Sequence, residues 1–257
     1  KELSNPSKVY ALFYSFFLIP IMITIFGVLF FFLFKMLTYE KQDPYHLLNN
    51  INAGALTKRW QSAYELSNLM SDTTKIPNDQ LFVNQLKTLY EKSIHDDSRI
   101  RTYLALAMGQ TGNKVFCSNL MVGVSDKYLE NRIGAIKSLG MLGCEESLPY
   151  LNKFILSDGD NQERLSAVIS LGLLKDVSSM KYLSEILNDE EPNLRWDAAI
   201  SLTKIGSKKG YPIIKKLLNR DYYLSYKEVD LNEINNSLLT VLAIVSKFPD
   251  KMFYKEL

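Results

Sequence analysis

Residues 132–143 read RIGAIKSLGMLG, residues 164–175 read RLSAVISLGLLK, and residues 195–206 read RWDAAISLTKIG. Each copy has an alanine three residues after its arginine, a leucine seven residues after it, and an aspartate six residues before it. The arginines are separated by 32 and 31 residues. A unit that recurs at such a period is typical of repeat proteins, in which each copy is one supersecondary unit.

A second apolar stretch accompanies each of these copies. Residues 147–158, 178–189 and 209–220 carry apolar side chains at spacings of three and four, which is one face of an α-helix. Pro149 and Pro212 stand where the first turn of a helix tolerates proline. Each repeat is therefore predicted to be a pair of short helices. No segment shows sustained alternation with a period of two, so the predicted fold is all-α.

Weaker copies extend the pattern outward on both sides. Arg59 and Arg101 begin two earlier second helices, and residues 235–248 keep the apolar stripe of a last one without its arginine, after an insert at residues 222–230. Terminal repeats degenerate because one of their faces meets solvent. The sequence predicts an α-solenoid of about six helix pairs from Pro44 to Phe248.

The pattern D-x5-R-x2-A-x3-L-G, complete from Asp158 to Gly172, resembles the HEAT-repeat family and, within it, the short bacterial-type PBS-lyase HEAT-like repeats. The resemblance is strong over residues 99–218 and weak outside them. It implies a solenoid whose second helices line the concave face. It also implies a role among scaffolds and adaptors, with chromophore lyases and DNA-binding proteins as rarer relatives.

The repeated charged residues are interpreted as a structural ladder and not as catalysts. Each aspartate is expected at the turn between paired helices, where it accepts from backbone donors and pairs with an arginine of its own or the next repeat. Exposed pairs of this kind stabilise by about 0–1 kcal/mol each. The predicted ladder consists of Asp126, Arg132, Asp158, Arg164, Asp189 and Arg195.

A shallow trough is predicted on the concave face, at the second, sixth and ninth positions after each arginine. Small residues at its centre and apolar ones beside it suit a partner's helix or loop. An equally weighted alternative is that the serines permit tight packing between helices. The predicted partner-binding residues are Tyr103, Gln110, Ser138, Met141, Ser166, Ser170, Leu173, Ser201 and Lys204.

Two further groups of residues each have a structural and a functional interpretation. Trp60 and Trp196, each one residue after an arginine, are expected to be packed ridge residues more often than interface anchors. The C-terminal basic and aromatic tract is expected to be a solvated face, with contact to lipid headgroups or an acidic partner loop as the alternative. This tract consists of Lys215, Lys216, Arg220, Tyr222, Tyr223 and Tyr226.

The N-terminal region has the composition of a membrane span. Residues 9–34 contain no charged side chain, and about 20 apolar residues are enough to cross a bilayer core. We predict a flank at residues 1–8, a transmembrane helix at 9–37, a connector at 38–43 and the solenoid at 44–257. Tyr14, Pro20 and Gly27 are the predicted membrane or partner contacts within the span, with a passive anchor as the alternative.

Composition excludes several kinds of site. The net charge of +2 disfavours a nucleic-acid groove, and His46 and His95 with two cysteines offer no metal ligand set. Cys117 and Cys144 are predicted to be unpaired and buried, which suits a reducing compartment. Together with the lysines and Arg59 that follow the span, this predicts a cytoplasmic solenoid.

These patterns predict a non-enzymatic, membrane-anchored scaffold without a cofactor, which binds a protein partner such as an integral membrane transporter or secretion complex. A bilin or chromophore lyase is the alternative, and a nucleic-acid-binding solenoid ranks third.

Overall fold

The computed structural model describes residues 13–37, 43–226 and 230–256. The chain divides into two compact units, Lys1–Gln42 and Asp43–Leu257. The predicted flank at residues 1–8, the start of the predicted span and the connector at 38–42 lie outside the described residues.

The first unit is one helix, which opens with a π-helical segment (Tyr14–Leu18) and continues as α2 (Ile19–Leu37). Pro20 is the second residue of α2, just after the π-helical segment, and proline has no N–H to donate to the preceding turn. The hydroxyl of Thr24 donates to the carbonyl of Pro20 over 2.8 Å. From Tyr14 to Met36 the helix is long and apolar enough to cross a membrane, and none of it is buried within the protein.

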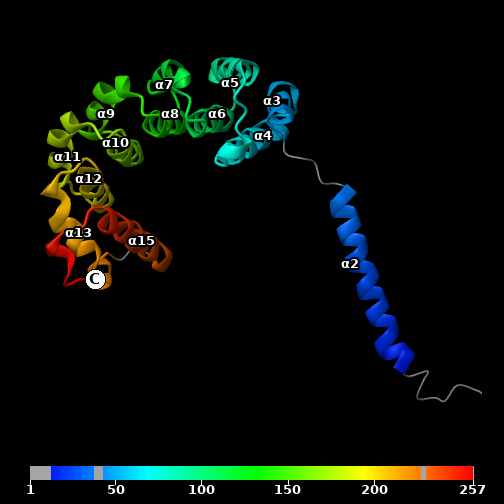
Figure 1. Ribbon diagram of the computed structural model, residues 1–257. Helices are drawn as coiled ribbons and strands as arrows, with labels where there is room; N and C mark the ends of the chain where they lie inside the picture. Colours follow the sequence, from blue (N-terminus) through cyan, green and yellow to red (C-terminus); the bar gives the residue numbers. More distant parts are fainter. Residues whose placement is uncertain (1–12, 38–42, 227–229, 257) are drawn as a thin grey trace, which may run out of the picture. The chain divides into compact units, whose positions relative to one another are not determined.

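The second unit consists of helix pairs stacked side by side in an arc, with one helix of each pair on the outer row and one on the inner row (Figure 1). The outer helices are α3 (Pro44–Ala53), α5 (Gln80–Lys92), α7 (Cys117–Gly123), α9 (Leu148–Ile155), α11 (Met180–Ile186) and α13 (Tyr211–Leu217). The inner helices are α4 (Leu56–Leu69), α6 (Ser98–Gln110), α8 (Leu129–Leu142), α10 (Asn161–Leu174), α12 (Pro192–Lys204) and α15 (Leu231–Lys247). A short helix, α14 (Arg220–Tyr223), occupies part of the predicted insert.

Local sequence explains where these helices begin and end. Asp97 and Asp160 cap α6 and α10 by accepting hydrogen bonds from backbone N–H groups of the first turn. Gly112 and Gly143 follow α6 and α8 with φ of +67° and +70°, a left-handed conformation that glycine adopts without a steric penalty. These glycines therefore mark the ends of the two inner helices.

Short 3-10 turns lie between many of the helices; most join one pair to the next, whereas Ser93–His95 lies within a pair, between α5 and α6. They are Thr73–Lys75, Ser93–His95, Lys114–Phe116, Glu145–Ser147, Val177–Ser179, Lys208–Gly210 and, after the last helix, Lys251–Phe253. The described residues contain helices and no strand, which confirms the all-α prediction and the six helix pairs.

The core is continuous across most of the stack. One cluster of buried side chains runs from Leu47 on α3 to Leu202 on α12. A second, smaller cluster joins α12 to the last pair and includes Trp196, Tyr223 and Phe253. Because a single pair cannot bury its own apolar face, this shared core is what holds each repeat in place.

The prediction of two unpaired cysteines is wrong. Cys117 and Cys144 form a disulfide bond, with Cα atoms 5.8 Å apart and a sequence separation of 27. Cys117 is the first residue of α7, and Cys144 directly precedes the 3-10 turn that leads into α9. The bond therefore joins the starts of two consecutive repeats. Helical, apolar sequence around each cysteine concealed this, because the two sites approach only when the repeats stack.

Candidate functional site

Three serines on the inner helices form a repeated contact between neighbouring repeats. Ser138, Ser170 and Ser201 donate to the carbonyl oxygens of Ala105, Ile136 and Val168, over 2.7, 3.0 and 2.9 Å. Each acceptor lies near the middle of the preceding inner helix. Each serine also faces a glycine of that helix: a Cβ on Gly140 would stand 2.6 Å from the Cβ of Ser170. The serines therefore set the spacing of the stack.

The predicted trough is consequently wrong at its centre. Ser138, Ser166, Ser170 and Ser201 are buried, as is Gly134 at the second position of its repeat. An inner helix in the middle of the stack is covered on its flanks by two neighbours, so the second and sixth positions pack sideways. The alternative that the serines serve helix packing is confirmed.

On α6, α8 and α10, solvent reaches the inner face at the first, fifth and ninth positions after the arginine. On α12 the first and fifth positions, Trp196 and Ile200, are buried. Met141 and Leu173, at the ninth position, are 38% and 43% exposed, as predicted. Tyr103, Gln110 and Lys204 are partly exposed. We use the name inner strip for the apolar residues of this register on α6, α8 and α10, which are Leu106, Ile133, Met141, Leu165, Ile169 and Leu173.

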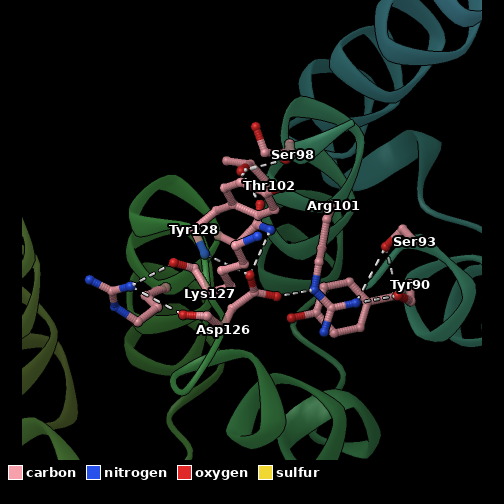
Figure 2. Close-up of polar contacts among 10 residues, drawn as sticks. Tyr90, Ser93, Ser98, Arg101, Thr102, Asp126, Lys127 and Tyr128 are labelled. Atoms are coloured by element: carbon pink, nitrogen blue, oxygen red, sulfur yellow. Dashed lines mark hydrogen bonds and ion pairs between the residues drawn. The ribbon is translucent and has the colours of Figure 1, made fainter. Parts of the chain in front are cut away.

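The ionic ladder runs between repeats, and its best-buried step is Arg101 with Asp126 (Figure 2). The Nε of Arg101 donates to the carboxylate over 2.7 Å, and both side chains are almost fully buried. Arg101 also donates to the carbonyl of Tyr90 over 2.6 Å and lies over the Tyr90 ring, 4.1 Å from its centroid. Burial raises the pKa of Tyr90 to about 12 despite the nearby guanidinium.

The carboxylate of Asp126 has further partners within its own turn. It accepts from the backbone N–H of Tyr128 and from the side-chain amide of Asn131, each over 3.0 Å. The guanidinium of Arg132 donates to the backbone carbonyl of Asp126 over 3.1 Å. The charged groups of the cluster are thus paired with one another and with the backbone, and together they fix the turn.

The other steps of the ladder follow the same rule, in which an arginine pairs with an acid of the next repeat. Arg59 pairs with Asp96, and Arg164 pairs with Asp189. Burial raises the pKa of Asp189, but the hydrogen bond from Arg164 and the other interactions outweigh it, so that the pKa is lowered.

Two predicted steps are replaced. Asp158 is exposed and makes no hydrogen bond or ion pair with the described residues, and Arg132 instead forms a two-fold contact with Glu163 at 2.9 and 3.1 Å. Arg195 donates to the hydroxyl of Tyr226 over 3.2 Å. Glu163, on the first turn of α10, takes the place of Asp158 as the partner of Arg132.

Trp196 is a core residue, which confirms the ridge interpretation. It is 6% exposed, and its ring packs against the rings of Tyr222, Tyr223 and Tyr226. The aromatic half of the predicted C-terminal tract is therefore packed inside the last repeats and is not a surface. Trp60 is partly buried, with the guanidinium of Arg99 4.6 Å from its ring centroid.

A pocket of about 180 Å³ lies between α12 and α15, at the end of the inner row. Asp197 lines it, and this carboxylate makes no hydrogen bond with the described residues. Burial raises the pKa of Asp197 to about 6, with Lys204 acting in the opposite direction. Burial lowers the pKa of Lys204, and Lys175 and Lys247 contribute to that lowering. Sequence reasoning placed Asp197 in the trough register without recognising that a pocket surrounds it.

Within the part of the chain that the structure describes, no group of three or more histidine, cysteine or acidic side chains could hold a metal ion. The inner face thus presents apolar side chains, lysines and one desolvated carboxylate. Such an arrangement can bind a chain segment.

Comparison with known proteins supports the fold. Residues 153–228 match the model of HEAT repeats, which confirms the predicted repeat type over that range. Among curated proteins, none matches the chain.

Solved structures include several similar solenoids. One is from the complex of CpcE and CpcF of phycocyanin lyase from a Nostoc species, with a TM-score of 0.61, 16% identity, and coverage of 85% of this chain and 94% of that chain. An engineered protein follows with a TM-score of 0.49, 13% identity and coverage of 80% and 98%. A designed armadillo repeat protein for modular peptide recognition has a TM-score of 0.42, 14% identity and coverage of 78% and 98%. At these identities the likeness concerns the fold alone.

Proposed function

We propose that this protein is a membrane-anchored scaffold whose solenoid binds a segment of a protein partner on the inner strip. The observation that carries the proposal is the exposure of Met141 and Leu173 beside Ile133, Leu165 and Ile169, on consecutive inner helices. Contiguous exposed apolar side chains, bordered here by the lysines Lys137 and Lys204, are a common feature of protein interaction sites. An amphipathic helix or an extended chain is the occupant that such a groove suits.

The anchor is the helix from Tyr14 to Met36, which has the length and composition of a single span. An integral membrane complex is the partner that an anchored solenoid meets most often, since tethering raises the effective concentration of membrane-bound partners. The exposed Pro20 and Gly27 lie within the helix and offer it a second contact with such a complex.

The disulfide bears on the side of the membrane. Stable disulfides form in oxidising compartments, whereas cysteines in the cytosol are kept as reduced thiols. The count of lysine and arginine around the span favours a cytoplasmic solenoid, whereas the Cys117–Cys144 bond favours the opposite side. We give the bond more weight, because flanking charge is a statistical bias while a cytosolic location would leave these thiols reduced. We propose an extracytoplasmic solenoid.

Site-specific photo-crosslinking tests the binding site. A crosslinking residue at Leu173 on α10, which is 43% exposed, should give a discrete adduct with one integral membrane protein in native membranes. The matched control is Tyr150 on the outer helix α9, which is 45% exposed and should give no such adduct. Equal adducts from both positions, or none from Leu173, would contradict the proposal.

Chromophore-lyase activity is the second candidate, and the likeness to the CpcE–CpcF complex motivates it. It requires a bilin bound by the solenoid. Absorbance spectra of the purified protein mixed with an open-chain tetrapyrrole separate the two candidates: a shifted and intensified band supports the lyase, and an unchanged spectrum eliminates it.

A further inference from the structure

The stack changes at its last step, between α12 and α15. In the preceding repeats the second position after the arginine is a small buried residue, Gly134 or Ser166, against the neighbouring inner helix. At α12 this position is Asp197, which lines a pocket of about 180 Å³ between α12 and α15. The junction also leaves the buried indole N–H of Trp196 without a hydrogen-bond partner among the described residues. This step is therefore not closed as the interior steps are.

The lining of the pocket has two kinds of wall. Ile200 and Val241 supply aliphatic surface, whereas Asn193, Asn236 and Thr240 supply side-chain oxygens around the carboxylate of Asp197. A buried carboxylate with no hydrogen-bond donor is unfavourable, and a cationic group that binds to it restores the lost interactions. Burial keeps the pKa of Asp197 near 6, so the group is charged at neutral pH.

The chemistry of the lining fits an arginine side chain. Its methylene stem packs against aliphatic walls, and its planar guanidinium donates to a carboxylate in a two-fold manner while its remaining N–H groups reach other oxygens. Lys204 lies on the same helix as Asp197, and its charge lowers the pKa of this carboxylate. Among the described residues, no hydrogen bond or ion pair joins Lys204 to Asp197. Lys204 therefore leaves the hydrogen-bonding capacity of the carboxylate unused.

The pocket continues the inner strip. Trp196 and Ile200 occupy the first and fifth positions of α12, the register in which Leu165 and Ile169 are partly exposed on α10. On α12 both residues are buried and line the pocket. A segment lying along the strip therefore reaches the pocket at the next repeat. We propose that the pocket between α12 and α15 receives an arginine side chain of the partner segment that docks on the inner strip. This inference rests on the proposed scaffold function and specifies the chemistry of its partner.

Short peptides test the pocket without knowledge of the partner. The probes are acetyl-Gly-Arg-Gly-amide, its lysine counterpart, and its citrulline counterpart, which is neutral and nearly the same shape as arginine. Binding to the full chain in detergent is followed by the fluorescence of Trp196 in a Trp60→Phe background, because the chain has only two tryptophans. The arginine peptide should bind at least tenfold more tightly than the citrulline peptide, with lysine between them.

Asp197→Asn should remove the preference for arginine over citrulline. Asp158→Asn is the matched control, since Asp158 is exposed and remote in sequence from the pocket, and it should leave the preference intact. If Asp197→Asn disturbs folding, Asn236→Leu on the exposed side of α15 replaces it and should weaken arginine binding several-fold. Equal affinities for arginine and citrulline in the parent protein, or an unchanged preference in both pocket variants, would overturn the inference.

The two proposals fail separately. A specific adduct from Leu173 with no arginine preference eliminates the pocket and keeps the scaffold. An arginine preference without that adduct supports the pocket as an arginine site but shows that the partner does not dock on the inner strip.

Discussion

Removal of the Cys117–Cys144 bond should destabilise the solenoid measurably. The bond closes a loop with a sequence separation of 27, which contains α7 and α8. In the chain-entropy model a loop of this length corresponds to about 3.5 kcal/mol of stability at 25 °C. For a domain of this size, about 1 kcal/mol shifts Tm by about 2–4 °C, so the expected decrease is about 7–14 °C.

The assay is thermal unfolding of the full chain in detergent, followed by circular dichroism, for the parent protein and the Cys117→Ala/Cys144→Ala variant. Alanine is used because both cysteines are buried and a serine hydroxyl would add an unsatisfied polar group. A reductant should lower the Tm of the parent to near that of the variant and should leave the variant unchanged. Because neighbouring repeats unfold partly independently, the loss is expected first in the pairs that the bond joins.

Two results would refute this reasoning. A Tm that is the same with and without reductant would show that the loop closure contributes nothing. Alkylation of both cysteines by a reagent added at the moment of lysis would show that the bond is absent in the cell and would return the solenoid to a reducing compartment.

Three other perturbations test the stack and the pocket. Arg101→Met leaves Asp126 buried without its cation and should cost about 3–5 kcal/mol in urea unfolding, and restoration by the additional change Asp126→Asn would confirm that the unpaired charge is the cause. Ser170→Leu should cost about 1–3 kcal/mol by forcing α8 and α10 apart, whereas the exposed Leu173→Ser should change stability by no more than about 0.5 kcal/mol; similar losses would contradict the assignment of the two positions. Burial raises the pKa of Asp197 from the ordinary aspartate value of 3.8 to about 6 in the folded state, so the folded protein binds this proton more tightly. Stability should therefore fall as pH rises from about 4 to 6, by at most about 3 kcal/mol. Asp197→Asn should remove this slope.

The repeat itself could be predicted from the sequence because its signals are local. Apolar spacing defines each helix, and Gly112 and Gly143 mark ends that only glycine adopts freely. The ladder was predictable in kind, since Asp and Arg recur at fixed spacing. The partner of each arginine could not be predicted. The repeat after Arg132 offers both Asp158 and Glu163, and only the folded structure selects Glu163.

The inner face was predicted one residue out of register at most positions, for a physical reason. Sequence periodicity separates a buried face from the rest of a helix, but it does not show how many neighbours that helix has. In the stack each inner helix contacts its partner and two lateral neighbours. Ser170, polar and therefore expected in solvent, is buried and satisfied by a carbonyl of the preceding helix. The same limit hid the disulfide, which joins residues brought together by stacking alone.

The position of the pocket follows from the way the solenoid ends. An interior repeat needs small side chains at its flanks, because the next inner helix lies against them at close range, as the Gly140–Ser170 contact shows. After α12 the insert that contains α14 separates the last pair from the regular register, and α15 lacks the arginine that would continue the ladder. Arg195 turns instead to Tyr226, and Asp197 lines the pocket between α12 and α15. The loss of repeat geometry at this end thus creates room for a polar pocket beside a regular apolar strip, which is the combination that a partner segment with one basic residue would recognise.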